Sequence, residues 1–320
     1  MRTAIIGTDN SKYPSFSFQC RKAFEKLGFE TKYFNYRYLK LHKTKFTNSI
    51  LNKSIIKKVL DYNPDILFVN KGETILPNVI KKISSSGIKT LNWIIDEPFG
   101  KFYKNNKINN IDEYDYFFVF DPYYLDDLKK INQNSYYLPC AADPENVHIE
   151  VMPFDKRNYI SEVSFIGSHE KKRENLLRNL TNYNLNVWGY RWKYIQDKKL
   201  INNVRNNIPK GKEMCKLFNL SKVNLNIHAL HSINGVNLRT FEILATKSFM
   251  LCDYFSEIPK LFRMNKEIVC YNNLNDLKHK IDYYLANEKE RNKISLAGYK
   301  RVLKEHTVLH RIKNIISKIK

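Results

Sequence analysis

Short apolar runs alternate with helical patterns along almost the whole chain, and this alternation limits the fold more than any other feature. In the first half, helical patterns such as those at 49–62 and 75–83 separate apolar runs at 3–7, 31–36, 66–69, 90–95, 116–120 and 136–138. Strands that alternate with helices of this length are typical of parallel sheets with helices on both faces. The sequence therefore predicts an α/β protein built on doubly wound parallel sheets.

A second series of the same kind follows a segment with three prolines at 139–153. Its apolar runs lie at 163–167, 185–189, 223–227, 249–252 and 268–271, and helical patterns at 275–285, 288–303 and 306–320 end the chain. A chain of 320 residues with 43% hydrophobic content is long enough for two well-buried cores. We therefore predict two Rossmann-like domains, 1–150 and 151–320, joined by a proline-rich linker.

The stretch at 228–253 carries most of the expected chemistry and reads HALHSINGVNLRTFEILATKSFMLCD. It follows an apolar run, passes through a polar loop, and enters a short helical pattern before a second apolar run. Such a βαβ unit places its loop at the carboxyl edge of a parallel sheet, where α/β proteins bind ligands. Within it, Arg239 can bind a phosphate and Glu242 can bind a pair of sugar hydroxyls.

The same stretch carries a family resemblance. The segments NLRTFE and YYLANEKERNKISLAGYKRVLKEHTVLHR, together with LNWIIDEPF, YDYFFVFDPYYLDDLKK and YYLPCAADPE upstream, resemble CgeB-like glycosyltransferases. These are group-1 type enzymes with the GT-B fold, in which two Rossmann-like domains face a cleft. The resemblance implies sugar transfer from a nucleotide-diphosphate sugar, such as a UDP-sugar, bound by the C-terminal domain. The acceptor would enter from the N-terminal domain, and the last helix would brace against that domain.

By this resemblance, Glu242 matches the second of two glutamates, eight positions apart, that contact the donor in related retaining enzymes. The first position is Asn234, a departure that leaves donor sugar and stereochemical course open. The alternative is that Glu242 only pairs with Arg239, three residues back on the same helix. The other donor-binding residues expected in this stretch are His231, Asn237, Leu238, Arg239 and Thr240.

Two earlier strand ends supply further candidates for donor binding. Glycine at a strand end lets the main chain approach a ligand, and a helix N-terminus with an arginine attracts anions. Aromatic side chains in the next loop could stack on a nucleobase, although buried aromatics are more often part of a core. These candidates are Gly167, Ser168 and Arg173 after one strand, Trp188, Gly189, Tyr190 and Trp192 after the next, and Lys210 in a later basic loop.

Acidic side chains at strand ends in the first half are candidates for a general base. Asp96 and Glu97 follow the run at 90–95, and Asp9 lies in the first strand-to-helix loop. An attacking hydroxyl must lose its proton, and a carboxylate can accept it. These carboxylates could instead cap a helix or bind loop amides. Arg239 is the fourth catalytic candidate, because a fixed cation would neutralise the diphosphate as it leaves.

We expect neither a metal nor a cofactor other than the donor. The five cysteines are scattered, so they predict no disulfide framework and no zinc site. His306 and His310 stand four apart on one expected helix, but no third ligand is nearby and core or surface positions are favoured. Free cysteines, together with the absence of any secretory or membrane-spanning run, favour a cytoplasmic protein with at most peripheral contact with a membrane.

The formal net charge of +22 leaves other functions open. Residues 151–320 hold 32 basic and 15 acidic side chains, so the second half carries most of the charge. Such a field attracts nucleic acid, anionic lipid or a phosphorylated substrate, and it can also reflect composition alone. The alternatives are a nucleic-acid-associated basic protein or a glycosyltransferase that modifies DNA, which we consider less favoured, and an inactive scaffold that binds sugar nucleotides. The acceptor could be a sugar, a glycan, a lipid-linked group or a protein.

Overall fold

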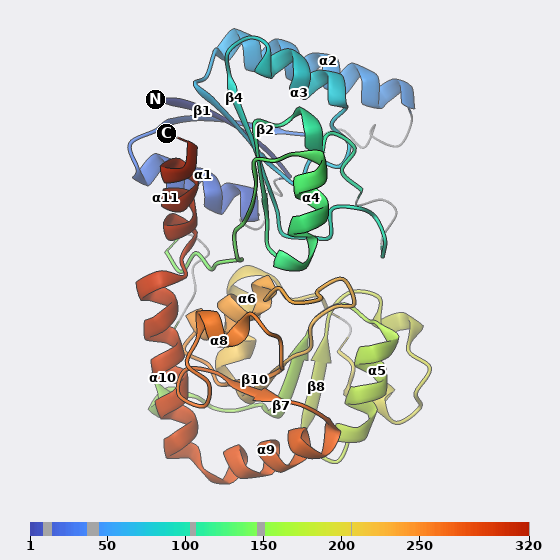
Figure 1. Ribbon diagram of the computed structural model, residues 1–320. Helices are drawn as coiled ribbons and strands as arrows, with labels where there is room; N and C mark the ends of the chain where they lie inside the picture. Colours follow the sequence, from blue (N-terminus) through green and yellow to red (C-terminus); the bar gives the residue numbers. More distant parts are fainter. Residues whose placement is uncertain (9–14, 37–44, 103–106, 146–150, 206, 320) are drawn as a thin grey trace. The chain divides into compact units, whose positions relative to one another are not determined.

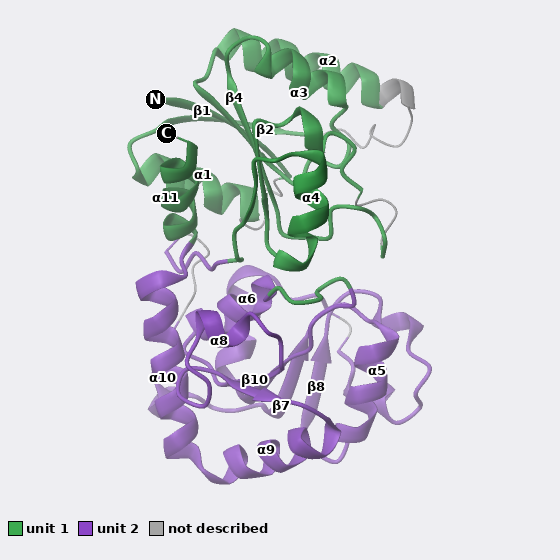
Figure 2. Ribbon diagram, viewed as in Figure 1, with its two compact units in different colours: residues 1–140, 231–235, 308–320 green, residues 141–230, 236–307 purple. Residues whose placement is uncertain are grey.

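A computed structural model describes residues 1–8, 15–36, 45–102, 107–145, 151–205 and 207–319 of the chain, with the main chain alone at 45–47. It divides into two compact units (Figure 2). Unit 1 comprises Met1–Cys140, His231–Gly235 and Val308–Lys320, and unit 2 comprises Ala141–Leu230 and Val236–Thr307. The chain therefore passes from unit 2 into unit 1 and back within the stretch at 228–253.

Unit 1 is built on a six-stranded parallel sheet with the strand order β2-β1-β3-β4-β5-β6. Its strands are β1 (Arg2–Gly7), β2 (Glu30–Asn35), β3 (Ile66–Asn70), β4 (Lys89–Ile94), β5 (Tyr116–Val119) and β6 (Ser135–Tyr137). Its helices are α1 (Phe16–Lys26), α2 (Lys45–Tyr62), α3 (Pro77–Ser84), α4 (Leu125–Ile131) and α11 (Val308–Ile319), with short 3₁₀ turns η3 (Ile111–Glu113) and η4 (Pro122–Tyr124).

Helices cover both faces of this sheet. Helices α1 and α11 lie side by side on one face, and α2 and α3 pack together on the other (Figure 1). Every residue of β3 is buried, as expected for a central strand between two helical layers. Ser15 caps the start of α1, and Gly28 follows its end with φ +83°, a conformation that glycine adopts without strain.

Unit 2 is built on a five-stranded parallel sheet with the order β11-β10-β9-β7-β8. Its strands are β7 (Ser161–Ile166), β8 (Leu185–Trp188), β9 (Ser221–Asn226), β10 (Met250–Asp253) and β11 (Val269–Tyr271). Its helices are α5 (Lys171–Leu177), α6 (Gly211–Asn219), α7 (Leu238–Ala245), α8 (Ile258–Leu261), α9 (Leu274–Ala286) and α10 (Glu288–Glu305), with 3₁₀ turns η5 (Phe154–Lys156), η6 (Arg178–Leu180), η7 (Trp192–Tyr194) and η8 (Leu200–Asn203).

Helix α7 is central to the packing of unit 2, because it contacts α6, α10 and both of its flanking strands. Phe241, Ile243, Leu244 and Ala245 are buried along its inner face. Gly298 on α10 has no room for a side chain, since a Cβ there would lie 2.4 Å from the Glu267 carbonyl oxygen. Close packing therefore fixes α7 while the polar side chains of its first turns stay partly exposed.

The α/β class with two parallel sheets is confirmed, but one local expectation is wrong. His306 and His310 do not share a helix face, because His306 lies at the C-terminal end of α10 and α11 begins at Val308. The His306 ring is buried against Phe241 and Phe262, and its Nε2 lies 2.9 Å from the Leu261 carbonyl oxygen. His306 is thus a core residue that joins α10 to the loop after α8.

Three further observations concern residues with expected structural roles. The chain passes from unit 1 to unit 2 at Cys140, inside the proline-rich segment, and α11 is grouped with unit 1, where it packs on α1. All five cysteines are free and buried. Within the described ranges, no helix is both long enough and apolar enough to span a bilayer.

Candidate functional site

The carboxyl edge of the unit 2 sheet brings together most of the residues expected to bind a donor. Helix α7 begins there, and Asn237 caps it: the Asn237 Oδ1 accepts the Thr240 amide at 3.1 Å. Asn237 also exchanges two hydrogen bonds of 3.0 Å with Asn226 at the end of β9, and Asn226 donates to the Thr240 hydroxyl. These side chains therefore fix the start of α7, and Leu238 is partly exposed in its first turn.

Arg239 and Glu242 form an ion pair on the outer part of α7. The Arg239 Nη1 lies 2.5 Å from the Glu242 Oε2, and the two side chains are 26% and 18% exposed. The guanidinium also contacts Met214 and lies over the ring of Phe218, both on α6. Burial raises the pKa of the Glu242 carboxyl, and the positive charge of Arg239 opposes that rise. The pair presents one cation and one carboxylate at a partly open surface.

Two glycines, Gly167 and Gly189, pack closely together at the ends of β7 and β8. The Gly167 amide donates to the Trp188 carbonyl at 2.9 Å. A Cβ at Gly189 would lie 2.0 Å from the Gly167 carbonyl oxygen, and Gly189 has φ +139°, so no other residue fits there. The Trp192 ring nitrogen donates to the same Gly167 carbonyl at 2.8 Å. The main chains of two strand ends thus lie at close range, and the absence of side chains at both glycines leaves room for a ligand phosphate at this sheet edge.

Arg173, in contrast, is buried and bound to main-chain carbonyls. Its Nε and Nη2 donate to the Ile227 carbonyl at 3.1 and 2.8 Å, and its Nη1 donates to the Ser168 carbonyl at 2.8 Å. The guanidinium therefore joins the ends of β7 and β9. Ser168 itself is exposed, and Lys210 is exposed just before α6.

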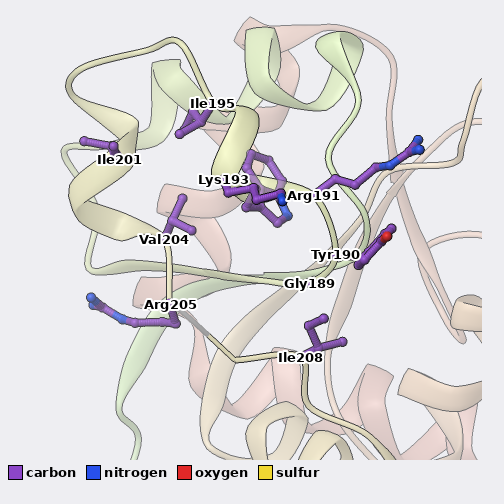
Figure 3. Close-up of a pocket in the computed structure, with 10 residues that line it drawn as sticks. Gly189, Tyr190, Arg191, Lys193, Ile195, Ile201, Val204, Arg205 and Ile208 are labelled. Carbon is purple, nitrogen blue, oxygen red and sulfur yellow. The ribbon is translucent and has the colours of Figure 1, made fainter.

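A pocket of about 410 Å³ lies beside Gly189. Its lining comes from two segments, 189–195 and 201–208, and combines aromatic, aliphatic and cationic side chains (Figure 3). Tyr190 is 59% exposed at this pocket, whereas Trp188 and Trp192 are buried in the core. Trp192 also lines the pocket, but of the aromatic candidates Tyr190 is the one with a largely exposed ring.

His228, which is buried, and Asp253, which is partly exposed, form a pair at the carboxyl ends of β9 and β10 that was not expected from the sequence. The His228 Nδ1 lies 2.6 Å from the Asp253 Oδ1, and the same carboxylate accepts the His228 amide and an ammonium hydrogen of Lys172. Hydrogen bonds and charge from these groups, outweighing burial, lower the pKa of Asp253 to about 2. Neighbouring parallel strands bring their ends together, so the position of Asp253 at the carboxyl end of β10 was the available signal.

The carboxyl edge of the unit 1 sheet holds a second polar cluster. The Lys71 Nζ lies 2.7 Å from the Asp96 Oδ2, and the His231 Nε2 lies 3.4 Å from the Asp96 Oδ1. Lys71 has φ +68°, and the Asn92 side chain donates to its carbonyl at 3.0 Å. A non-glycine residue rarely adopts this conformation, and such strain collects at functional sites. Lys71 was not expected from the sequence.

The other acidic candidates of unit 1 differ from Asp96. Glu97 is completely buried, and its carboxylate accepts the amides of Phe99 and Lys101 at 2.7 and 3.1 Å. It therefore organises the loop after β4. Asp9 lies outside the described residues. His231 and Asn234, which we expected beside a donor in the C-terminal domain, belong to the segment that is grouped with unit 1.

Comparisons with known proteins match part of this chain to a family model and most of it to one curated protein. Residues 171–317, which include α7 and its ion pair, match the family model described as glycosyl transferase-like. The chain is also 23% identical over 273 residues to the spore protein CgeB of Bacillus subtilis, a match that covers 79% of this chain and 82% of CgeB. The expected resemblance to CgeB-like glycosyltransferases is thereby confirmed.

Solved structures of glycosyltransferases have the same fold. A sucrose-phosphate synthase from Thermosynechococcus elongatus superposes with a TM-score of 0.71 at 10% identity, over 99% of this chain and 98% of that one. HepE from Anabaena, in complex with UDP and glucose, superposes with a TM-score of 0.69 at 8% identity, over 100% and 99% of the two chains. The fold of this chain is thus that of GT-B glycosyltransferases, and the fold together with the family match over 171–317 supports sugar transfer from a nucleotide sugar.

Proposed function

We propose that this protein transfers a sugar from a nucleotide-diphosphate sugar, with UDP as the nucleotide, to an acceptor hydroxyl without a metal ion. The observation that carries the proposal is the partly exposed ion pair of Arg239 and Glu242 on α7, inside the segment that matches the family. In this assignment, Glu242 accepts hydrogen bonds from the ribose hydroxyls. Arg239 faces the diphosphate.

The other donor contacts follow from the same sheet edge. Gly167 and Gly189 let the phosphates approach main-chain amides at the ends of β7 and β8, and exposed Lys210, directly before α6, adds a positive charge. The pocket beside Tyr190 takes the base, because an exposed aromatic ring offers a face for stacking. UDP is the favoured nucleotide because the similar HepE structure contains it.

Departure of the diphosphate needs charge stabilisation, and cationic side chains replace a metal ion in this proposal. Fixed cations at the developing charge are among the largest contributions to catalysis. The described ranges contain no group of three His, Cys, Asp or Glu side chains arranged to hold a metal ion. Arg239 supplies this stabilisation in our assignment.

Asp96 is the residue of unit 1 that we assign to the acceptor. It is partly exposed and held by Lys71, whereas the carboxylate of Glu97 is already bound to loop amides. A carboxylate at this position can accept the proton of an attacking hydroxyl. The acceptor class stays broad, covering sugars, glycans, lipid-linked groups and proteins, and the basic charge of the chain would favour an anionic acceptor or membrane surface.

A thermal-shift and turnover experiment tests this function. We expect UDP to stabilise the protein in the presence of EDTA, and UDP-sugars to be hydrolysed slowly or transferred in the same buffer. Stabilisation by duplex DNA alone at near-physiological salt would instead support the nucleic-acid-associated alternative. UDP binding without turnover of any UDP-sugar would support the inactive scaffold. The reason to test for it is Asn234, which stands where related enzymes have a donor-contacting glutamate.

A further inference from the structure

Asp121 has contacts that its role as a local cap does not explain. Its Oδ1 accepts the Tyr123 amide at 3.0 Å, which caps η4 as its sequence position predicts. Its carboxylate also accepts the amide of Ile233 at 2.8 Å and the amide of Asn234 at 3.2 Å, more than a hundred residues along the chain. Both donor amides belong to the loop His231–Gly235, which is grouped with unit 1 although its neighbours on either side belong to unit 2.

The charge of Asp121 is balanced by these amides and not by a cation. The side chain is completely buried, and within the described residues no Lys, Arg or His forms an ion pair with it. A buried carboxylate is unfavourable unless hydrogen bonds satisfy its oxygens. The contact is therefore mutual: the loop amides satisfy Asp121, and Asp121 fixes the main chain of the loop.

Two further contacts hold the same loop to the segment that follows β5. Gly235 lies directly on Asp121, because a Cβ there would come within 2.6 Å of the Asp121 Cα and 2.8 Å of the Phe120 carbonyl oxygen. The Tyr124 hydroxyl donates to the His231 carbonyl at 2.7 Å. The position of the loop is thus determined at His231, at Ile233 and Asn234, and at Gly235.

The loop matters for chemistry because of Asn234. This residue stands eight positions before Glu242, where the family resemblance places a donor-contacting glutamate. We propose that Asp121 is a positioning residue of the transferase: it holds the main chain at Asn234 in the arrangement that the transfer step requires, and it does not touch the donor itself. This inference rests on the proposed function. It adds that transfer depends on the main-chain position of Asn234 as well as on the donor-binding residues of unit 2.

Kinetics of matched variants test this role. Loss of a charged hydrogen-bond acceptor for two loop amides is expected to lower kcat about tenfold to a hundredfold in Asp121→Asn. The affinity for UDP should equal that of the wild type, because the residues assigned to UDP lie in unit 2. Gly235→Ala should reproduce this pattern by displacing the loop sterically, and Tyr124→Phe should do so more weakly. Asp126→Asn, at an exposed position of α4, is the control and should behave as wild type.

Amide hydrogen exchange supplies a readout that does not depend on turnover. In Asp121→Asn and in Gly235→Ala, exchange at 231–235 should accelerate while the core strands of both units stay protected. Faster exchange in the loop with unchanged kcat would show a purely structural contact and overturn the proposal. A parallel loss of kcat and UDP affinity would overturn it too, since the effect would then not be confined to the transfer step.

The proposed function and this inference fail in different ways. If wild-type protein turns over no nucleotide sugar, the proposed function fails and this role of Asp121 fails with it. If wild-type protein is active and Asp121→Asn equals Asp126→Asn in kcat, only the inference about Asp121 fails. Should Asp121→Asn prove too unstable to purify, Tyr124→Phe removes one hydrogen bond to the loop without a change in charge. Its kcat is then compared with that of Asp126→Asn in the same way.

Discussion

The carboxyl edges of the two sheets look equivalent in topology but differ in how their polar groups are used. At the edge of the unit 1 sheet, carboxylates are largely occupied by the chain itself: Asp121 and Glu97 bind main-chain amides. At the edge of the unit 2 sheet, the Arg239–Glu242 pair is partly exposed, and a pocket opens beside Tyr190. The carboxylates at the unit 1 edge therefore mainly fix the main chain of loops, whereas the unit 2 edge keeps charged side chains accessible to a ligand.

The exceptions at each edge are as informative as the rule. In unit 1, Asp96 is partly exposed and bound by the side chain of a strained lysine. In unit 2, Arg173 is buried and its donors are bound to carbonyls. A charged residue at the right strand end is thus not enough to identify a ligand contact. A charged side chain is available to a ligand only where the neighbouring main chain does not already satisfy its hydrogen bonds.

Substitution of Asp96 by Asn should give the largest effect on activity. If Asp96 removes the acceptor proton, kcat for transfer should fall by about 10² to 10⁴, since general-base catalysis contributes on this scale. Glu97→Gln is the matched comparison at the next residue. It should destabilise the loop by ~1–3 kcal/mol, measured by urea unfolding, because a side-chain amide then faces the amides of Phe99 and Lys101. Equal kcat values for Asp96→Asn and wild type would remove Asp96 from the mechanism.

Arg239→Ala should follow, with a loss of about 10² to 10³ in kcat/KM for a UDP-sugar. Removal of one group that stabilises the leaving charge costs this much in other enzymes. Arg239→Lys should recover only part of the activity, because an ammonium lacks the planar fork of donors. Arg178→Ala, at an exposed position of the same unit, controls for the loss of one positive charge. A folded Arg239→Ala protein with full transfer activity would contradict the proposed mechanism.

Local and periodic features of this fold could be read from the sequence, whereas contacts between distant residues could not. The strand alternation, the glycine that ends α1 and the position of α7 depend on residues within one or two turns of each other. The second role of Asp121 depends on the amides of Ile233 and Asn234, and the sequence around Asp121 does not predict these contacts.

The same limit applies to the candidate site. Arg173 has the spacing of an anion-binding arginine, yet its surroundings in three dimensions satisfy its donors with the carbonyls of Ser168 and Ile227. The His228–Asp253 pair was closer to prediction, since both residues end neighbouring strands of one βαβ unit. Sequence order predicts which strand ends meet, but burial decides which side chains remain available.

Asp253→Asn tests whether the His228–Asp253 pair at the unit 2 edge is structural. The folded pKa of Asp253 is about 2, below its ordinary value of 3.8, so its stabilising contribution is present above roughly pH 4 and is lost as the pH falls through 2. A shift of this size corresponds to about 2 kcal/mol in the free energy of unfolding at pH 7. The difference between Asp253→Asn and wild type should therefore shrink near pH 2, while exposed Asp155→Asn shows none at either pH. A difference that is independent of pH would contradict this assignment.

The smallest expected effect comes from Tyr190 at the pocket, and it tests whether that pocket holds the base. Stacking of one ring contributes about 0.5–1.5 kcal/mol, so Tyr190→Ala should raise the Kd for UDP about twofold to tenfold, and Tyr190→Phe should not. Tyr194→Ala is a close control, because Tyr194 is equally exposed, at 59%, in the same loop but does not line the pocket. Inorganic pyrophosphate lacks a base, so its inhibition constant should be the same for Tyr190→Ala and wild type. If Tyr190→Ala weakens pyrophosphate as much as UDP, the pocket binds phosphate and the stacking role of Tyr190 is wrong.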